Sequence, residues 1–136
     1  MNVLSNTLLT HSIFNAHNGR LGGYGRTLVM GIVNVTPDSF SDGGAFYDSQ
    51  TAISHARRLA DEGADLLDIG GESTRPQAEP ISAAEEWARV GPVLKEVIPL
   101  VPCPVSIDTY KAETADRALS LGARIVNDVW GLQHDP

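Results

Sequence analysis

From residue 27 onward, short apolar runs alternate with amphipathic stretches, and this alternation restricts the fold more than any other feature of the chain. The runs have the length of buried strands, whereas the stretches between them carry apolar residues at helical spacing. Strands that alternate with helices form a parallel sheet through right-handed βαβ units. The sequence therefore predicts an α/β fold with strands at residues 28–33, 64–70, 104–108 and 123–127.

Local signals place three helices between these strands. A cap at Asp48 or Ser49 is expected to open the first helix. The sequence from Ser82 to Glu85 matches a capping box at the start of the second helix, which Pro92 is expected to kink. Apolar residues at helical spacing mark the first helix at Ala52, Ala56, Leu59 and Ala60 and the third at Ala115, Ala118 and Leu119. In the second helix the spacing places Trp87, Val90, Leu94 and Val97 on one face.

Two α/β architectures fit this pattern, a (β/α)₈ TIM barrel and an open doubly wound sheet. A complete barrel usually needs about 250 residues, and about four βα units can be recognised in the 136 residues. If the fold is a barrel, residues 27–136 are its first half. Residues 1–26 are polar with several glycines, and we expect an N-terminal extension or a hairpin there.

The composition limits which binding partners and which cellular compartment are expected for the protein. The formal net charge of −7, without clusters of Lys or Arg, is a poor match for nucleic acid, and we expect no such partner. No apolar run approaches the roughly 18–20 residues of a membrane span. The single Cys103 excludes an intramolecular disulfide, and no basic residue precedes Arg20 as in a signal peptide. A cytoplasmic protein is expected.

Polar residues close each predicted strand: Asn34, Asp68, Asp108 and Asn127. Each has a structural explanation taken alone, because Asn34 can shape a turn, Asp68 can cap a loop, and Asp108 or Thr109 can cap the next helix. In parallel α/β folds, however, the carboxyl ends of the strands meet at the edge where ligands bind. Four polar groups at one edge together indicate a binding site.

The segment from Asn34 to Gly44 is dense in turn residues and long for a connection in such a compact unit. This favours a lid or binding loop over a merely mobile connection. Phe40, surrounded by polar residues, is suited to contact a ligand ring.

Three motifs in this order resemble those of the dihydropteroate synthase family. Residues 30–44, MGIVNVTPDSFSDGG, are similar to the first signature of that family, and residues 63–76, which include DIGGESTRP, are similar to the second. Residues 106–110 with residues 125–128 resemble the next two strand ends. The similarity extends from about Thr27 to Pro136, and it implies the (β/α)₈ barrel, of which this chain supplies about the first four βα units.

The resemblance also implies a reaction in folate biosynthesis and makes such an enzyme a sulfonamide target. The amine of p-aminobenzoate displaces diphosphate from 6-hydroxymethyl-7,8-dihydropterin diphosphate, with Mg²⁺ as cofactor. Asn34 is implied as the metal contact, and Asp108 and Asp42 as catalytic residues. Those implied to bind substrate are Phe40, Thr74, Arg75, Pro76, Asp108 and Asn127.

Family features of the later strands are missing: a second pterin-binding Asp, a Lys and a Ser-x-Arg-x-His segment. Only Arg75 and Lys111 are expected to offer positive charge at the ligand edge. Half a barrel would leave strand edges and an apolar face uncovered. We therefore expect this segment alone to be unstable and inactive, and the full-length enzyme to be a homodimer.

Two alternatives remain open. A methyltetrahydrofolate-dependent methyltransferase uses a related pterin-binding barrel but transfers a methyl group to a corrinoid partner. A non-catalytic pterin-binding fragment would bind the ring without turnover. The loop NVTPDSFSDGG favours the synthase.

Overall fold

The structure is a computed structural model that describes residues 14–15, 20–21, 27–36, 44–73 and 78–135, with the backbone alone for residues 14–15, 20–21 and 44–48. The strands are β1 (Phe14–Asn15), β2 (Arg20–Leu21), β3 (Met30–Asn34), β4 (Leu66–Gly70), β5 (Val105–Asp108) and β6 (Ile125–Asn127). The helices are α1 (Gly44–Asp61), α2 (Ala83–Leu100) and α3 (Ala112–Leu121).

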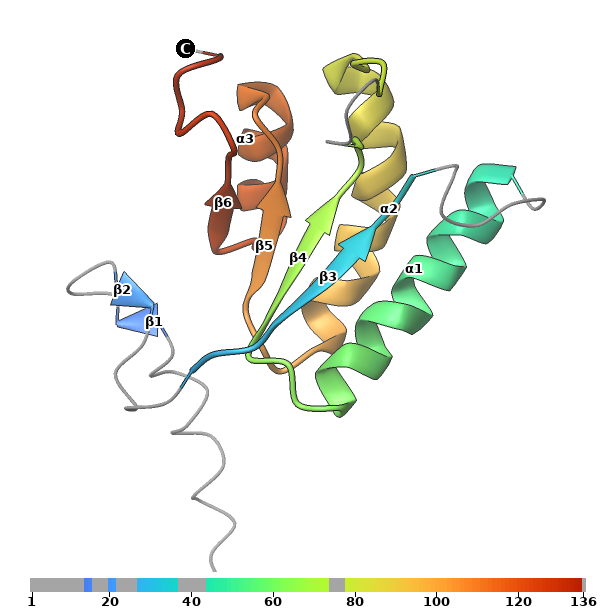
Figure 1. The fold of residues 1–136 in the computed structure, drawn as a ribbon. Helices are drawn as coiled ribbons and strands as arrows, with labels where there is room; N and C mark the ends of the chain where they lie inside the picture. The colour runs from blue at the N-terminus through green and yellow to red at the C-terminus, as the bar shows by residue number, and fades with distance from the viewer. Residues whose placement is uncertain (1–13, 16–19, 22–26, 37–43, 74–77, 136) are drawn as a thin grey trace, which may run out of the picture.

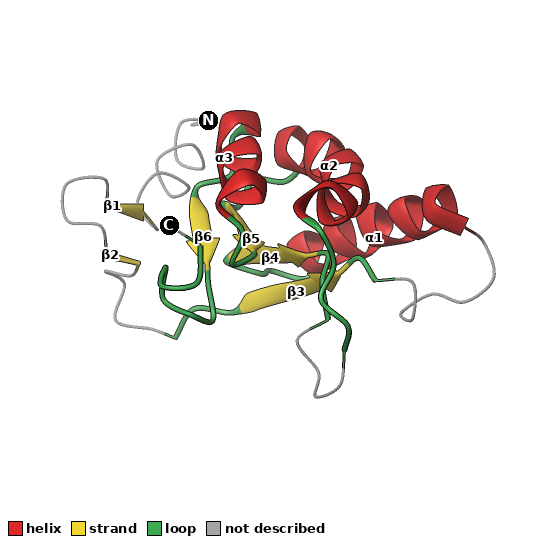
Figure 2. Ribbon diagram, turned by 90° about the horizontal axis from the view of Figure 1, so that it is seen from above, coloured by secondary structure: helices red, strands yellow, loops and turns green. Residues whose placement is uncertain are grey.

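The main sheet has four parallel strands in the order β3-β4-β5-β6, with a helix between each strand and the next (Figure 1). All three helices cover the same face of this sheet (Figure 2). A doubly wound sheet reverses its strand order at a switch point and carries helices on both faces. In a (β/α)₈ barrel, by contrast, the strands follow one another in sequence order and the helices cover one face. The observed arrangement therefore confirms the predicted barrel and excludes the open doubly wound sheet.

The core lies between the sheet and the helices. Val33, Leu67, Ile69 and Ile107 point from the strands toward the helices and are fully buried. On α2, the expected apolar face is confirmed: Val90, Leu94 and Val97 are fully buried, and Trp87 packs against them. The opposite face of β3 is open, since Met30 is 43% exposed and Ile32 is 55% exposed.

Two boundary predictions had different outcomes. Ser82 caps α2 as predicted, because its Oγ accepts a hydrogen bond from the Glu85 N–H at 3.2 Å. The predicted cap of α1 at Asp48 or Ser49 is wrong, since the helix already begins at Gly44. Asp and Ser are compatible with the first turns of a helix as well as with its cap, so they do not mark the boundary uniquely. Pro92 lies inside α2, which continues from Ala83 to Leu100.

The Ser82 cap leads to a stability prediction. Ser82→Ala is expected to lower the free energy of unfolding by about 1 kcal/mol, because the Glu85 N–H loses its acceptor. Urea denaturation of the intact protein measures this difference. Ser82→Asp keeps an accepting oxygen and should preserve stability, so an equal loss in both variants would contradict the capping role.

Outside the main sheet, β1 pairs with β2 in antiparallel fashion, with Phe14 opposite Leu21. Within the part of the chain that the structure describes, no helix has the length and apolar character needed to cross a membrane. After β6 the chain turns back toward the start of α3, where the Asp135 carboxylate accepts from the Ala112 N–H at 2.8 Å. This contact caps α3, whose own N-cap residue Lys111 makes no side-chain capping bond.

Candidate functional site

A row of polar residues closes the carboxyl edge of the sheet on the face that the helices leave open. The register places Asn34 beside Gly70, Gly70 beside Asp108, and Asp108 beside Asn127. Side chains of paired residues on neighbouring strands project from the same face. The structure therefore brings Asn34, Asp108 and Asn127 together, as the sequence predicted.

Glycine at position 70 makes room for the carboxylate of Asp108. A Cβ added at Gly70 would lie 3.3 Å from both Cβ and Oδ2 of Asp108. Any side chain at this position would press on Asp108 from the neighbouring strand. The gap in the row is thus occupied by the Asp108 carboxyl group itself.

Asp68 lies one row below, where it pairs in register with Ser106. It is only 4% exposed, and its Oδ2 accepts a hydrogen bond from Asn127 Nδ2 at 2.9 Å. Its Oδ1 and the neighbouring Ser106 Oγ are buried without a hydrogen-bond partner in the described part of the chain. The polar strand ends thus form two layers, of which the lower one is buried.

The electrostatics of the row centre on Asp108. Burial, followed by the nearby charges of Asp68, Glu86 and Asp128, raises the pKa of its carboxyl group from 3.8 to about 6. At neutral pH the group is therefore mostly ionised, within a cluster of like charges. Such a site favours ligands that bring N–H donors or positive charge to Asp108.

A second polar cluster fixes the loops that follow β4 and β5. Lys111 Nζ pairs with the Glu72 carboxylate and lies 3.6 Å from Glu86 Oε2. Tyr110 donates its hydroxyl hydrogen to Glu72 Oε1 at 2.9 Å, and Thr109 donates to Glu86 Oε2 at 2.8 Å. Lys111 is 9% exposed and Glu86 is 1% exposed, whereas Glu72 and Tyr110 are partly buried.

The cluster corrects two sequence-based expectations. Lys111 is not free to offer charge to a ligand, because Glu72 and Glu86 both engage it. Burial lowers the pKa of Lys111, but the hydrogen bond to Glu72 and the two carboxylate charges outweigh this effect and raise it overall. Thr109 is not the helix cap either: its Oγ1 accepts from the Lys111 N–H at 3.1 Å, one residue before α3.

Sequence reasoning missed Glu72, Glu86 and Tyr110. Glu86 offered a signal, because it stands at helical spacing with Val90, Val93 and Val97 and so falls on the buried face of α2. A charged residue on an apolar face needs a buried partner. Glu72 and Tyr110 gave no comparable signal, since their contact joins two separate loops.

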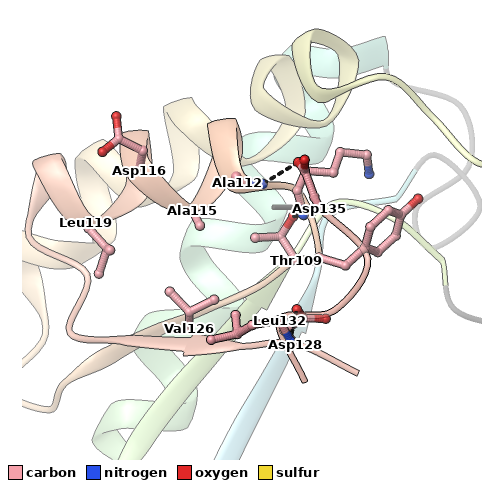
Figure 3. Close-up of a pocket in the computed structure, with 11 residues that line it drawn as sticks. Thr109, Ala112, Ala115, Asp116, Leu119, Val126, Asp128, Leu132 and Asp135 are labelled. Carbon is pink, nitrogen blue, oxygen red and sulfur yellow. Dashed lines mark hydrogen bonds between the residues drawn. The ribbon is translucent and has the colours of Figure 1, made fainter. Parts of the chain in front are cut away.

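A cavity of about 280 Å³ lies between α3 and the segment after β6 (Figure 3). Leu119, Val126 and Leu132 contribute apolar walls. The two carboxylates on the segment side already accept backbone hydrogen bonds: Asp128 from Trp130 and Leu132, and Asp135 from Ala112. We therefore assign the candidate site to the polar row and not to this cavity.

Five of the residues expected to bind substrate or act in catalysis lie outside the described residues: Phe40, Asp42, Thr74, Arg75 and Pro76. Among the described residues, no group of three or more His, Cys, Asp or Glu side chains could hold a metal ion. Asn34 is exposed at the end of β3. Burial raises the pKa of the Cys103 thiol, in keeping with a packed rather than a reactive cysteine.

Comparison with known proteins shows a family to which the chain is similar in sequence. Residues 30–136 match the family described as pterin binding enzyme. The dihydropteroate synthase of Bacillus subtilis (strain 168) is 55% identical over 111 residues, which cover 82% of this chain and 39% of that relative. The chain thus spans about two fifths of the length of the curated relatives it matches.

Two solved structures of the dihydropteroate synthase from Xanthomonas albilineans are similar in fold. The one with 4-aminobenzoic acid gives a TM-score of 0.78 at 50% identity and covers 86% of this chain and 44% of that chain. The one in complex with 7,8-dihydropteroate gives a TM-score of 0.72 at 46% identity and covers 85% and 42%. This likeness confirms that the chain supplies the first βα units of a (β/α)₈ barrel.

Proposed function

The chain belongs to the family of pterin-binding enzymes, and we propose that it forms the N-terminal part of a dihydropteroate synthase. That enzyme condenses 6-hydroxymethyl-7,8-dihydropterin diphosphate with p-aminobenzoate to give 7,8-dihydropteroate and diphosphate. The observation that carries the proposal is the row of Asn34, Asp108 and Asn127 at the ligand edge of the sheet. A carboxylate beside an amide suits the nitrogen-rich edge of a pterin ring.

Asp108 and Asp42 are the proposed catalytic residues, and Asp108 is the one of the two that lies among the described residues. As the bond between the pterin methylene carbon and the diphosphate oxygen breaks, positive charge spreads over the ring. A fixed carboxylate close to the ring stabilises this charge, and the neighbouring charges of Asp68 and Glu86 act in the same direction. The amine nitrogen of p-aminobenzoate then forms the new carbon–nitrogen bond and loses a proton.

Mg²⁺ is the proposed cofactor, with Asn34 as its contact in this chain. The amide oxygen of Asn34 is a hard ligand at an exposed position, and Mg²⁺ is commonly held by one or two protein oxygens together with water and substrate phosphates. When bound, the ion would neutralise and orient the leaving diphosphate.

The remaining roles rest on the family resemblance. We assign Thr74 and Arg75 to the region of the diphosphate and p-aminobenzoate, and Phe40, Asp42 and Pro76 to the p-aminobenzoate pocket. The second half of the barrel would supply further pterin and diphosphate ligands. We expect the complete enzyme to be a cytoplasmic homodimer with no nucleic-acid partner.

A chimera tests this function. It joins residues 1–136 to the part of the Bacillus subtilis relative that follows the aligned region. We expect the chimera to condense p-aminobenzoate with the dihydropterin diphosphate, and the 136-residue chain alone to remain inactive. A chimera that binds pterin without turnover would favour a non-catalytic protein, and dependence on a corrinoid partner would favour a methyltransferase.

A further inference from the structure

We propose that Asp68 is a positioning residue that fixes the side-chain amide of Asn127 in one orientation, so that the amide oxygen is presented to an N–H donor on the ligand. The inference rests on the proposed pterin-binding function and deepens it. It starts from the hydrogen bond between Asn127 Nδ2 and Asp68 Oδ2, which joins two residues 59 positions apart in the chain.

The chemistry of the two groups sets the orientation. An ionised carboxylate only accepts hydrogen bonds, whereas an amide has an accepting oxygen and a donating nitrogen. The amide nitrogen of Asn127 must therefore face Asp68, and its oxygen must point away from Asp68. An asparagine without such a partner can turn over and exchange a donor for an acceptor at the same place.

The burial of Asp68 argues against a purely stabilising role. It is a carboxylate that is 4% exposed, and its Oδ1 has no hydrogen-bond partner in the described part of the chain. Placing a charged group there costs stability, which a residue serving the core alone would avoid. Orienting Asn127 at the ligand edge gives this position a function.

The orientation has a consequence for ligand choice. Because Asn127 pairs with Asp108 in the register, an amide oxygen that faces away from Asp68 adds a second acceptor to the row on the neighbouring strand. Two acceptors match a ring edge that carries adjacent N–H and amino donors, such as the 2-amino-pyrimidinone edge of a pterin. They discriminate against a ring in which an oxygen replaces that amino group.

Asp68→Asn in the chimera tests the inference, because two facing amides can adopt either orientation. The readout is the ratio of dissociation constants for 6-hydroxymethylpterin and its 2-oxo counterpart, 6-hydroxymethyl-lumazine. The unchanged chimera should prefer the pterin, and Asp68→Asn should lower this preference about tenfold, as expected for one enforced hydrogen bond. Asp68→Asn should have no further effect when Asn127→Ala is already present.

Ser106→Ala is the matched control. Ser106 pairs with Asp68 in the register and is fully buried, and within the described residues its Oγ makes no hydrogen bond, to Asn127 or to any other residue. Its removal should leave the ratio unchanged. If Asp68→Asn keeps the preference of the unchanged chimera, or if both variants lose it equally, the positioning role is wrong. If the unchanged chimera binds no pterin at all, the proposed function itself fails.

A second measurement serves if Asp68→Asn does not fold. Exchange of the side-chain amide protons of Asn127 with solvent can be followed by NMR in the unchanged chimera, with exposed Asn34 as the comparison. Slow exchange at Asn127 relative to Asn34 is expected from the bond to a buried carboxylate. Equally fast exchange at both would overturn the proposal.

Discussion

Asp108→Asn is expected to lower turnover of the chimera at saturating substrate by about 10²- to 10³-fold, the usual cost of losing a group that stabilises transition-state charge. An asparagine keeps the size of the side chain and part of its hydrogen bonding, but it cannot offset positive charge on the pterin. The effect should therefore fall on turnover more than on pterin affinity. Exposed Asp116→Asn on α3 removes a charge away from the row and should leave turnover unchanged.

The same substitution should make the protein more stable above pH 6. The pKa of Asp108 is raised from 3.8 to about 6, so the folded state binds this proton more tightly than the unfolded state does. The free energy of unfolding consequently falls as the pH rises from about 4 to about 6, and the cost persists at higher pH. Asp108→Asn removes this cost.

Urea denaturation of the unchanged chimera and of Asp108→Asn at pH 4 and pH 7.5 shows whether the substitution raises or lowers the free energy of unfolding. The variant should gain stability relative to the unchanged chimera at pH 7.5 and show little gain at pH 4. Unchanged turnover at saturating substrate would refute the electrostatic role of Asp108. A variant that is less stable than the unchanged chimera at pH 7.5 would show that the ionised Asp108 carboxylate does not lower stability.

Lys111→Met is expected to have the largest effect on stability, a loss of about 3–5 kcal/mol in the free energy of unfolding. Met keeps the apolar stem of the side chain but leaves Glu72 and Glu86 buried without their cation. Thermal or urea denaturation of the chimera measures the difference.

Two further variants show whether the stability lost in Lys111→Met comes from the carboxylates that it leaves unpaired. Lys95→Met removes an exposed lysine from α2 and should be nearly neutral. Glu86→Gln combined with Lys111→Met should recover part of the lost stability, because a neutral amide replaces an unpaired charge. A Lys111→Met protein as stable as Lys95→Met would show that the buried cluster contributes nothing to folding.

Sequence periodicity was sufficient for the α/β class and the order of the strands and helices, because each element repeats a simple local pattern. Val90, Leu94 and Val97 recur at helical spacing, and their burial in α2 follows directly. The parallel register then determines which strand ends meet, so the proximity of Asp108 and Asn127 follows from the fold class. Neither result requires knowledge of contacts between distant segments.

Contacts between distant segments explain what the sequence could not predict. Lys111 looked available for a ligand because its partners, Glu72 and Glu86, stand in another loop and helix. The bond between Asp68 and Asn127 crosses the intervening strand β5 and depends on rotamers that no local pattern encodes. The start of α1 was misplaced because Asp48 and Ser49 suit a helix cap and an early helical turn equally well.

A crystal structure of the chimera with 6-hydroxymethylpterin would show where the ring binds. We expect the ring to lie across the carboxyl edge of β5 and β6, with hydrogen bonds to the Asp108 carboxylate and the Asn127 amide oxygen. A pterin bound elsewhere in the barrel, with both of these side chains facing only solvent or protein, would contradict it.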